Sequence, residues 1–201
     1  ITPEMRNEAR VRLGLQDNPI HIASFGYVDF RTKLSDVVVE AAAWLTQWGY
    51  QVALHFVGAA SPDQERAIMR RARLAGIEQI QITGFLDESQ FCDYLLAVDI
   101  GVQLRISPLL GVSGPLSDLA AFGTPAVASR GLAIDVDTPD YVQRLPDEVS
   151  SLMVAEAIEN QIRHPMDPKT RERLRAEYLE GKTPARYATQ LLGLIEQWVA
   201  P

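Results

Sequence analysis

The sequence is poor in several features that mark particular protein classes. It has one cysteine, Cys92, so no disulfide can form within the chain and a reducing compartment is indicated. No apolar run approaches the roughly 20 residues of a membrane-spanning helix, and no segment resembles a signal peptide. Positive charge is also scarce: 19 Lys and Arg stand against 26 Asp and Glu, which gives a net charge of −7. This balance argues against nucleic acid as the main partner but leaves room for a small anion in a local pocket.

Several enzyme motifs are missing as well. After the first predicted strand the sequence reads GYVDFR, so the glycine fingerprint of NAD and FAD domains is absent. There is no P-loop, no nucleophile elbow, and no cluster of His, Cys and carboxylates at metal-ligand spacing. The three histidines are scattered: His21 and His55 fall in predicted strands, where core positions are expected, and His164 falls at a helix end.

Short apolar runs alternate with helical patterns along most of the chain. The predicted strands are 20–25, 51–57, 79–83, 98–104, 125–129 and a weaker 141–145. Helices are predicted after Ser35 as a cap, after the Ser61–Gln64 capping box, after Asp87, and over 113–122, 150–163, 167–180 and 184–199. This alternation predicts an α/β fold: a Rossmann-like, doubly wound parallel sheet of about six strands.

The chain is long enough for one large domain, and 47% of its residues are hydrophobic, as in ordinary globular proteins. We expect a single domain over 1–201, with the Rossmann-like core at about 18–148 and a helical tail at about 150–199. Because the chain starts at Ile1 rather than Met, we also expect it to be a piece of a longer protein.

A ligand site can be predicted from the topology. With the common strand order 3-2-1-4-5-6, a crevice opens at the carboxyl ends of the first and fourth strands. The first end supplies Gly26, where the backbone can approach a ligand closely, and then Lys33; the second supplies Arg105. The following helix begins at Ser113–Gly114, and its free N–H groups and dipole suit phosphate. The pattern therefore favours an anionic ligand.

Asp118 lies one turn into that helix, on or near the side of its first residues. A carboxylate there would repel phosphate but could accept hydrogen bonds from a ribose diol further along the ligand. The alternative is a solvated helix residue. Likewise, Ser113 can be a simple N-cap and Lys33 a surface lysine.

Several ordered segments resemble the carboxy-terminal domain of GT-B retaining glycosyltransferases, and the glycosyltransferase 4 group above all. They are IASFGYVDFRTK, HFVGA, IQITGFLDESQFCDYLLAVDIGVQLR, SGPLSDLAAFGTPAVAS and RLPDE. The resemblance covers nearly the whole chain. It implies a domain that binds the nucleotide sugar, with the amino-terminal domain that binds the acceptor absent from this chain.

The resemblance also implies roles for individual residues. Gly26 would be the close-approach glycine, Lys33 the diphosphate contact, Phe85 the neighbour of the nucleobase, Ser113 and Gly114 the phosphate-facing amides, and Asp118 the ribose carboxylate in place of the usual glutamate. Two positions depart from the family. Its sugar-facing glutamate is replaced around Leu110 and Gly111, and the arginine that often follows the first glycine is Tyr27 here. Arg31 or Arg105 could replace the charge of that arginine.

The resemblance implies transfer of a hexose from a UDP- or GDP-sugar to a glycan or lipid-linked acceptor in bacterial polysaccharide or glycolipid synthesis. In this interpretation Lys33, Arg105 and the helix terminus stabilise the leaving diphosphate, and no metal or other cofactor is required. No catalytic residue is assigned. The chain alone is expected to be inactive and cytoplasmic, with peripheral association of the full-length protein at the inner face of the membrane left open.

Two other functions remain as alternatives. The first is a non-catalytic GT-B-like module that binds nucleotides or assembles with partners, because the sugar-facing glutamate is missing. The second is a GT-B-fold epimerase, which is less favoured because no suitable acid/base cluster is visible. An apolar stripe on the last helix, made of Tyr187, Leu191, Ile195 and Trp198, predicts an interface with the missing half.

Overall fold

A computed structural model describes residues 2–106 and 111–199 of the chain. Six strands form one parallel sheet in the order 3-2-1-4-5-6, as the sequence predicts. They are β1 (Ile20–Phe25), β2 (Val52–Val57), β3 (Gln79–Ile82), β4 (Ile100–Gln103), β5 (Ala126–Ser129) and β6 (Val142–Leu145). The weakly predicted sixth strand is therefore confirmed.

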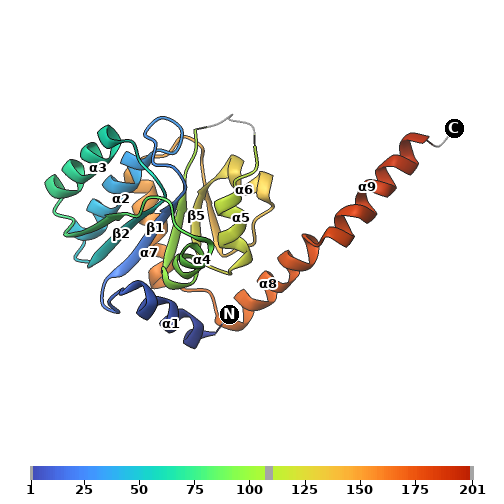
Figure 1. Cartoon of the computed structure of the whole chain (residues 1–201), viewed down its shortest axis with the longest axis horizontal. Helices are drawn as coiled ribbons and strands as arrows, with labels where there is room; N and C mark the ends of the chain where they lie inside the picture. The colour runs from blue at the N-terminus through green and yellow to red at the C-terminus, as the bar shows by residue number, and fades with distance from the viewer. Residues whose placement is uncertain (1, 107–110, 200–201) are drawn as a thin grey trace.

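Helices cover both faces of the sheet and give a three-layer domain (Figure 1). One face carries α2 (Ser35–Gln47), α3 (Pro62–Leu74) and α7 (Ser151–Arg163); the other carries α4 (Glu88–Ala97), α5 (Gly114–Ala121) and α6 (Arg130–Val136). Neighbouring strand residues such as Ile22 and Ala23 enter opposite cores. Burial on both faces explains why the strands are continuous apolar runs in the sequence.

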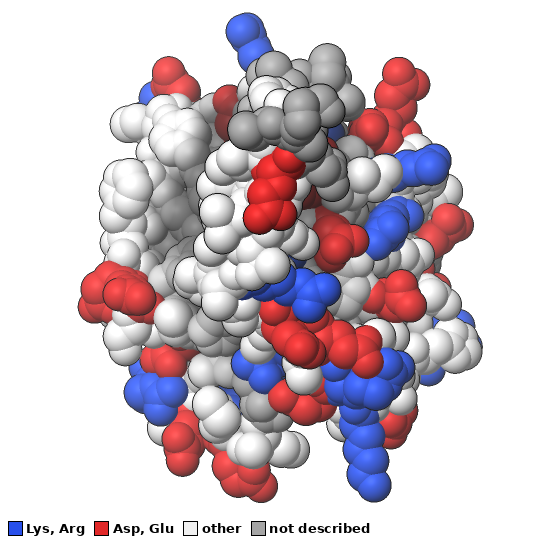
Figure 2. All heavy atoms as spheres, turned by 90° about the vertical axis from the view of Figure 1, so that its right-hand side faces the viewer, with Lys and Arg blue, Asp and Glu red and all other residues white. Residues whose placement is uncertain are grey.

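Two helices form the carboxy-terminal tail. The first, α8 (Pro168–Gly181), packs against α5, and the second, α9 (Pro184–Val199), projects away from the sheet (Figure 1). The apolar stripe on α9 is solvent-exposed, with Tyr187 at 68% and Trp198 at 90%. The face toward which α9 projects carries acidic, basic and uncharged side chains intermixed (Figure 2). The stripe is thus not part of the core of its own domain. Among the described residues, no helix is long and apolar enough to cross a membrane.

The predicted caps of α3 and α4 are confirmed, whereas the predicted cap of α2 is wrong. The Ser61–Gln64 capping box is present, and Asp87 caps α4 through the N–H of Gln90. Ser35, however, is not an N-cap: Leu34 occupies that position in the left-handed region, with φ 51° and no side-chain bond. Ser35 is instead buried, and its Oγ accepts the N–H of Asp29 at 3.1 Å. Its hydroxyl stabilises the preceding loop rather than the helix.

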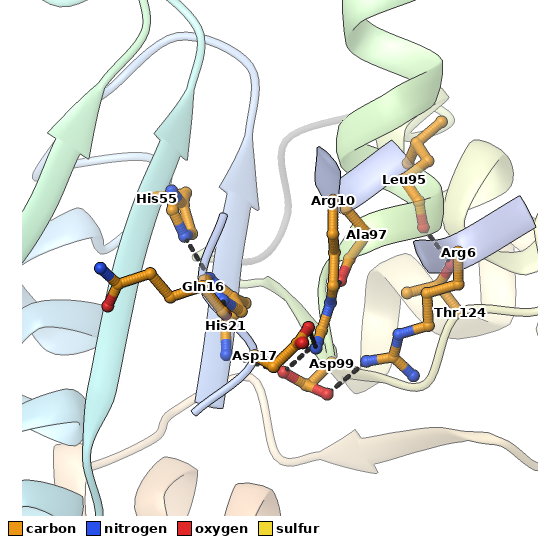
Figure 3. A network of polar contacts seen from close by, with 10 residues as sticks. All are labelled: Arg6, Arg10, Gln16, Asp17, His21, His55, Leu95, Ala97, Asp99 and Thr124. Atoms are coloured by element: carbon orange, nitrogen blue, oxygen red, sulfur yellow. Dashed lines mark hydrogen bonds and ion pairs between the residues drawn. The ribbon is translucent and has the colours of Figure 1, made fainter. Parts of the chain in front are cut away.

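An additional helix, α1 (Pro3–Leu13), is attached to the amino ends of the strands by the carboxylate of Asp99 (Figure 3). That carboxylate accepts hydrogen bonds from Arg6, from Arg10 at 2.9 Å and from the backbone N–H of His21 at 2.8 Å. It therefore joins α1, β1 and the start of β4 at one point. Charge-assisted bonds of this kind are stronger than neutral ones.

A pair of buried histidines lies beside this network (Figure 3). The Nε2 of His21 lies 2.7 Å from the carbonyl oxygen of Gln16, so this nitrogen carries the hydrogen and donates it. The Nδ1 of His21 then accepts from the Nε2–H of His55 at 2.9 Å. This assignment makes both rings neutral and leaves His55 Nδ1 as a buried lone pair without a partner in the described part of the chain.

At the opposite, carboxyl edge, the backbones of β1 and β2 meet at two glycines. The N–H of Gly26 donates to the Val57 carbonyl at 2.9 Å, and the Gly58 carbonyl accepts from the N–H of Gly84 at 3.2 Å. A Cβ on Gly58 would overlap the carbonyl group of Gly26. Only glycine therefore allows the two strand ends to lie this close together.

Replacing Gly58 with alanine is expected to lower the free energy of unfolding by about 1–3 kcal/mol, because the new methyl group meets rigid backbone. Gly181→Ala is the matched control, since no described atom lies within 4 Å of its Cβ position in α8. The control should be as stable as the parent or slightly more so. Urea unfolding of the three proteins measures the difference, and equal midpoints would contradict the close approach.

The histidine pair predicts a pH dependence of stability. Burial lowers the pKa of His55 to about 4 from 6.5, and burial also lowers the pKa of His21. Between pH 6.5 and 4 the unfolded chain therefore binds more protons, so the free energy of unfolding falls as the pH falls through this window. His55→Gln keeps an N–H donor for His21 but cannot titrate. Its loss of stability from pH 7 to 4 should be smaller by up to about 3 kcal/mol. If urea titrations give the parent and His55→Gln the same dependence of stability on pH, the histidine pair is not its cause.

Candidate functional site

The loop that follows β1 folds Lys33 back over the end of its own strand. The Nζ of Lys33 donates a hydrogen bond to the carbonyl of Phe25 at 2.9 Å. A Cβ on Gly26 would overlap that Nζ and would lie 3.9 Å from the Cγ of Pro115, at the start of α5. Gly26 has φ 97°, in the left-handed region that favours glycine. The predicted close-approach glycine thus sits between the lysine and the first turn of α5.

Arg105 follows β4 on the other side of the crevice. Its backbone N–H donates to the Oγ of Ser129 at 2.9 Å, and its guanidinium donates to the Gly111 carbonyl at 3.2 Å. The two loops are also joined directly, because the N–H of Ile106 donates to the Thr32 carbonyl at 3.2 Å. The fold therefore brings the loops bearing Lys33 and Arg105 together, as strand order predicts.

Lys33 and Arg105 carry positive charges that no described carboxylate contacts directly. Burial lowers the pKa of Lys33, and the positive charge of Arg105 lowers it further, while Asp29 acts in the opposite direction. Two neighbouring, half-buried cations form a site that favours an anion.

The amino end of α5 completes this side of the crevice. Ser113 is buried, and its Oγ caps the helix by accepting the N–H of Leu116 at 3.4 Å. Gly114 is exposed, and no described atom outside the helix lies within 4 Å of the position its Cβ would take. Ser113 is therefore an N-cap, and the backbone at Gly114 is open to an approaching ligand.

Asp118 lies apart from the two cations. Burial raises the pKa of this half-buried carboxyl, and its charge acts on the Cys92 thiol of α4 and the Tyr178 phenol of α8. The charges that act on Lys33 are those of Arg105 and Asp29. Within the described part of the chain, no side-chain donor reaches the Asp118 carboxylate, so both of its oxygens remain available as acceptors.

The remaining predicted positions fall around this site. Phe85 lies in the loop between β3 and α4 and is 92% exposed, without contact to the cations. Tyr27 is also exposed beside Gly26. Of the two positions where the sugar-facing glutamate is expected, Gly111 has φ 132° and Leu110 lies outside the described residues.

Sequence reasoning missed Gln103, the last residue of β4. Its side chain is 3% exposed, and its Nε2 has no hydrogen-bond acceptor among the described residues. An amide at the end of an apolar strand is usually a core residue, so only the position of Gln103 beside β1, where the strand order reverses, points to it. As for metals, the described residues contain no group of three or more His, Cys, Asp or Glu placed to hold one.

Comparisons with known proteins identify the fold. No protein-family model matches the chain, and no curated protein matches its sequence. Solved structures do match it. HepE from Anabaena, in complex with UDP and glucose, superposes with a TM-score of 0.79 at 18% identity, over 98% of this chain and 53% of HepE. WaaG, a glycosyltransferase involved in lipopolysaccharide biosynthesis, gives a TM-score of 0.65 at 18% identity, over 93% of this chain and 47% of WaaG.

A third structure is the carboxy-terminal domain of LpcC, a glycosyl transferase group 1 family protein from Francisella tularensis. It gives a TM-score of 0.68 at 21% identity, over 88% of this chain and 92% of that domain. The chain thus spans about half the length of HepE and WaaG but nearly all of an isolated carboxy-terminal domain. Its fold is that of one half of a GT-B glycosyltransferase.

The cation pair predicts binding of a small polyanion. Inorganic pyrophosphate should raise the unfolding temperature of the parent, because it binds the folded state alone. Lys33→Ala removes one charge-assisted contact, worth about 1.5–3 kcal/mol, so pyrophosphate should bind roughly ten- to a hundredfold more weakly. Lys169→Ala, which removes an exposed lysine at the start of α8, is the control and should keep the parent's response. If pyrophosphate raises the unfolding temperature of Lys33→Ala as much as that of the parent, the anion binds elsewhere.

Proposed function

We propose that the chain is the donor-binding domain of a glycosyltransferase that uses a nucleoside diphosphate sugar. The observation that carries this proposal is the pair of cations, Lys33 and Arg105, that no described carboxylate contacts directly, beside the open start of α5. Support comes from the likeness to HepE, whose structures are complexes with UDP and with UDP-glucose. A diphosphate matches the charge of this site better than a single phosphate would, because two cations and a helix terminus converge on it.

The nucleoside of the ligand would extend from this site toward α4. Asp118 offers two free carboxylate oxygens, which suit the vicinal hydroxyls of a ribose. In this proposal Phe85, in the loop that follows β3, would lie next to the base. Its exposure leaves the adjoining loop backbone open to the base. This placement assigns the diphosphate to the cations and the ribose to Asp118.

In the proposed reaction the chain stabilises the leaving group. Negative charge develops on the departing nucleoside diphosphate, and Lys33, Arg105 and the first N–H groups of α5 oppose it without reorganisation. These cations take the part that a metal plays in other transferases. The transferred sugar would be a hexose, and the acceptor a glycan or lipid in bacterial polysaccharide or glycolipid synthesis. We further propose that the reaction retains the configuration of the sugar, as in the glycosyltransferase 4 group, and that it takes place in the cytoplasm.

Acceptor binding is assigned to a second domain, which this chain lacks, so the isolated chain should not transfer sugar. The unpaired apolar stripe on α9 supports this assignment, because Tyr187, Leu191, Ile195 and Trp198 are exposed. Such a stripe on a projecting helix needs a partner surface.

A non-catalytic nucleotide-binding module is the second candidate. It is favoured by one observation: Gly111 and Leu110 replace the glutamate expected to face the donor sugar. Both candidates bind the nucleotide, so binding does not separate them. Donor turnover by the chain joined to an acceptor domain does, since only the transferase would release free nucleoside diphosphate.

The sharpest test of the donor site is Asp118→Asn. The substitution keeps the shape of the side chain but removes the charged acceptor of two hydroxyl groups. Charge-assisted bonds contribute about 1.5–3 kcal/mol, so affinity for UDP or GDP should fall roughly ten- to a hundredfold. The fold should be unaffected, because no described residue donates to this carboxylate. Calorimetric titration of UDP, GDP and their nucleosides measures the change.

Lys33→Ala provides the comparison within the same titrations. It should weaken the diphosphates much more than the bare nucleosides, whereas Asp118→Asn should weaken both. A parent that binds a diphosphate while Asp118→Asn binds it equally well would return this carboxylate to a solvated helix position.

A further inference from the structure

The loop between Gly26 and Lys33 is organised around one carboxylate, that of Asp29. Its Oδ1 accepts the backbone N–H of Arg31 at 3.0 Å, the backbone N–H of Thr32, and the hydroxyl of Thr32 at 2.6 Å. These bonds close a tight turn immediately before Lys33. A side chain that satisfies the next backbone N–H groups in this way fixes the path of the chain.

The same residue fastens the loop to two helices. Its backbone exchanges hydrogen bonds with Ser35, the first residue of α2: the Asp29 N–H donates to the Ser35 Oγ, and the Ser35 N–H donates to the Asp29 carbonyl at 3.2 Å. Its second carboxylate oxygen, Oδ2, accepts from the Nε2 of Gln64 in α3 at 3.3 Å. The turn is therefore held from α2 and α3 and not only by local bonds.

The turn also carries the link to the other cation. Thr32, whose N–H and hydroxyl are both bound by Asp29, presents its carbonyl to the N–H of Ile106 at 3.2 Å. Ile106 directly follows Arg105. The Asp29 carboxylate thus stabilises the turn that precedes Lys33 and, through Thr32, the backbone contact of Ile106 next to Arg105.

An acidic residue so close to an anion site needs an explanation. Hydrogen bonds from Thr32 and Arg31 lower the pKa of Asp29, so it is ionised at neutral pH, and its charge acts to raise the pKa of Lys33. Its oxygens accept from the loop and from Gln64, and no ion pair joins Asp29 to Lys33 or Arg105. The carboxylate thus opposes the lowering of the Lys33 pKa by burial and by Arg105, without forming an ion pair with the ammonium group.

We propose that Asp29 is a positioning residue for the diphosphate: by bonding the turn at Arg31 and Thr32 and, through Thr32, the backbone at Ile106, it sets Lys33 and Arg105 at the spacing that the ligand requires. The inference rests on the proposed donor site. Asp29 does not contact the ligand itself, and its removal should act on the phosphate portion alone.

The experiment compares Asp29→Ala, Asp29→Asn and the control Asp63→Asn. Asparagine keeps the Oδ1 acceptor but loses the charge, whereas alanine loses both. Asp63 lies in the first turn of α3 with its side chain 91% exposed, so its substitution removes the same charge without touching the loop. Each protein is titrated with UDP and GDP and with uridine and guanosine.

Asp29→Ala should weaken the affinity for whichever diphosphate binds the parent about tenfold or more, which is equivalent to about 1.4 kcal/mol. The affinity for the corresponding nucleoside should fall by less than about twofold. The diphosphate affinity of Asp29→Asn should lie between those of the parent and Asp29→Ala, and that of Asp63→Asn should equal the parent's. Amide hydrogen exchange at Ile106 should accelerate in Asp29→Ala. By NMR, the pKa of Lys33 should fall in Asp29→Asn and stay unchanged in Asp63→Asn, which a merely structural role would not produce.

The outcomes separate the two proposals. If the parent binds neither UDP nor GDP, the donor site itself is wrong. If the parent binds a diphosphate and Asp29→Ala binds it equally well, or loses nucleoside affinity in the same proportion, the positioning role is overturned while the donor site stands. Unchanged exchange at Ile106 in Asp29→Ala would overturn the coupling between the two loops.

Discussion

The pairing of β1 with β4 is the constraint on which the other parts of the structure depend. Asp99 holds the amino ends of these two strands together and attaches α1 to them. At the carboxyl ends the chain leaves toward opposite faces of the sheet, and the bond from Ile106 to Thr32 joins the two loops. The strand order reverses between these strands, and in folds of this class ligands bind at such a point. The crevice is thus a product of topology, and the sequence supplies its charge.

That local charge is opposite in sign to the charge of the whole chain. The net charge is −7, yet Lys33 and Arg105 lie together without a carboxylate paired to either among the described residues. Leaving a half-buried ammonium group unpaired costs free energy, as the lowered pKa of Lys33 reflects. A bound anion recovers that cost.

The strands were predictable because each is a short apolar run between turn signals, and the parallel order followed from helices of regular length between them. Other elements were not. α1 has an N-cap at Thr2, a proline at its first position and a left-handed Gly14 at its end. The segment between these signals is mostly polar, so its apolar pattern does not predict a helix. α6 has seven residues and no side-chain cap, so nothing local marks its start.

The candidate site likewise has residues that the sequence predicts and residues that it does not. Gly26, Lys33, Arg105 and the start of α5 follow from strand order, because position alone brings them to one edge. Ser35 was misassigned as a cap, since its partner is the backbone of Asp29 and not its own helix. The hydrogen bond from Gln64 to Asp29 and the unpaired amide of Gln103 depend on tertiary neighbours. No pattern along the chain encodes them.

The meeting of Gly26 and Gly58 has a consequence for how this fold can diverge. Each glycine looks replaceable by itself, since one sits at a turn and the other at a strand end. A Cβ at position 58 would meet the backbone of residue 26 whatever side chain that residue carried, so the constraint falls on position 58 and on the path of the chain at Gly26. A lineage that gains a side chain at position 58 must first separate β1 from β2 at this edge, and with them the loop that presents Lys33.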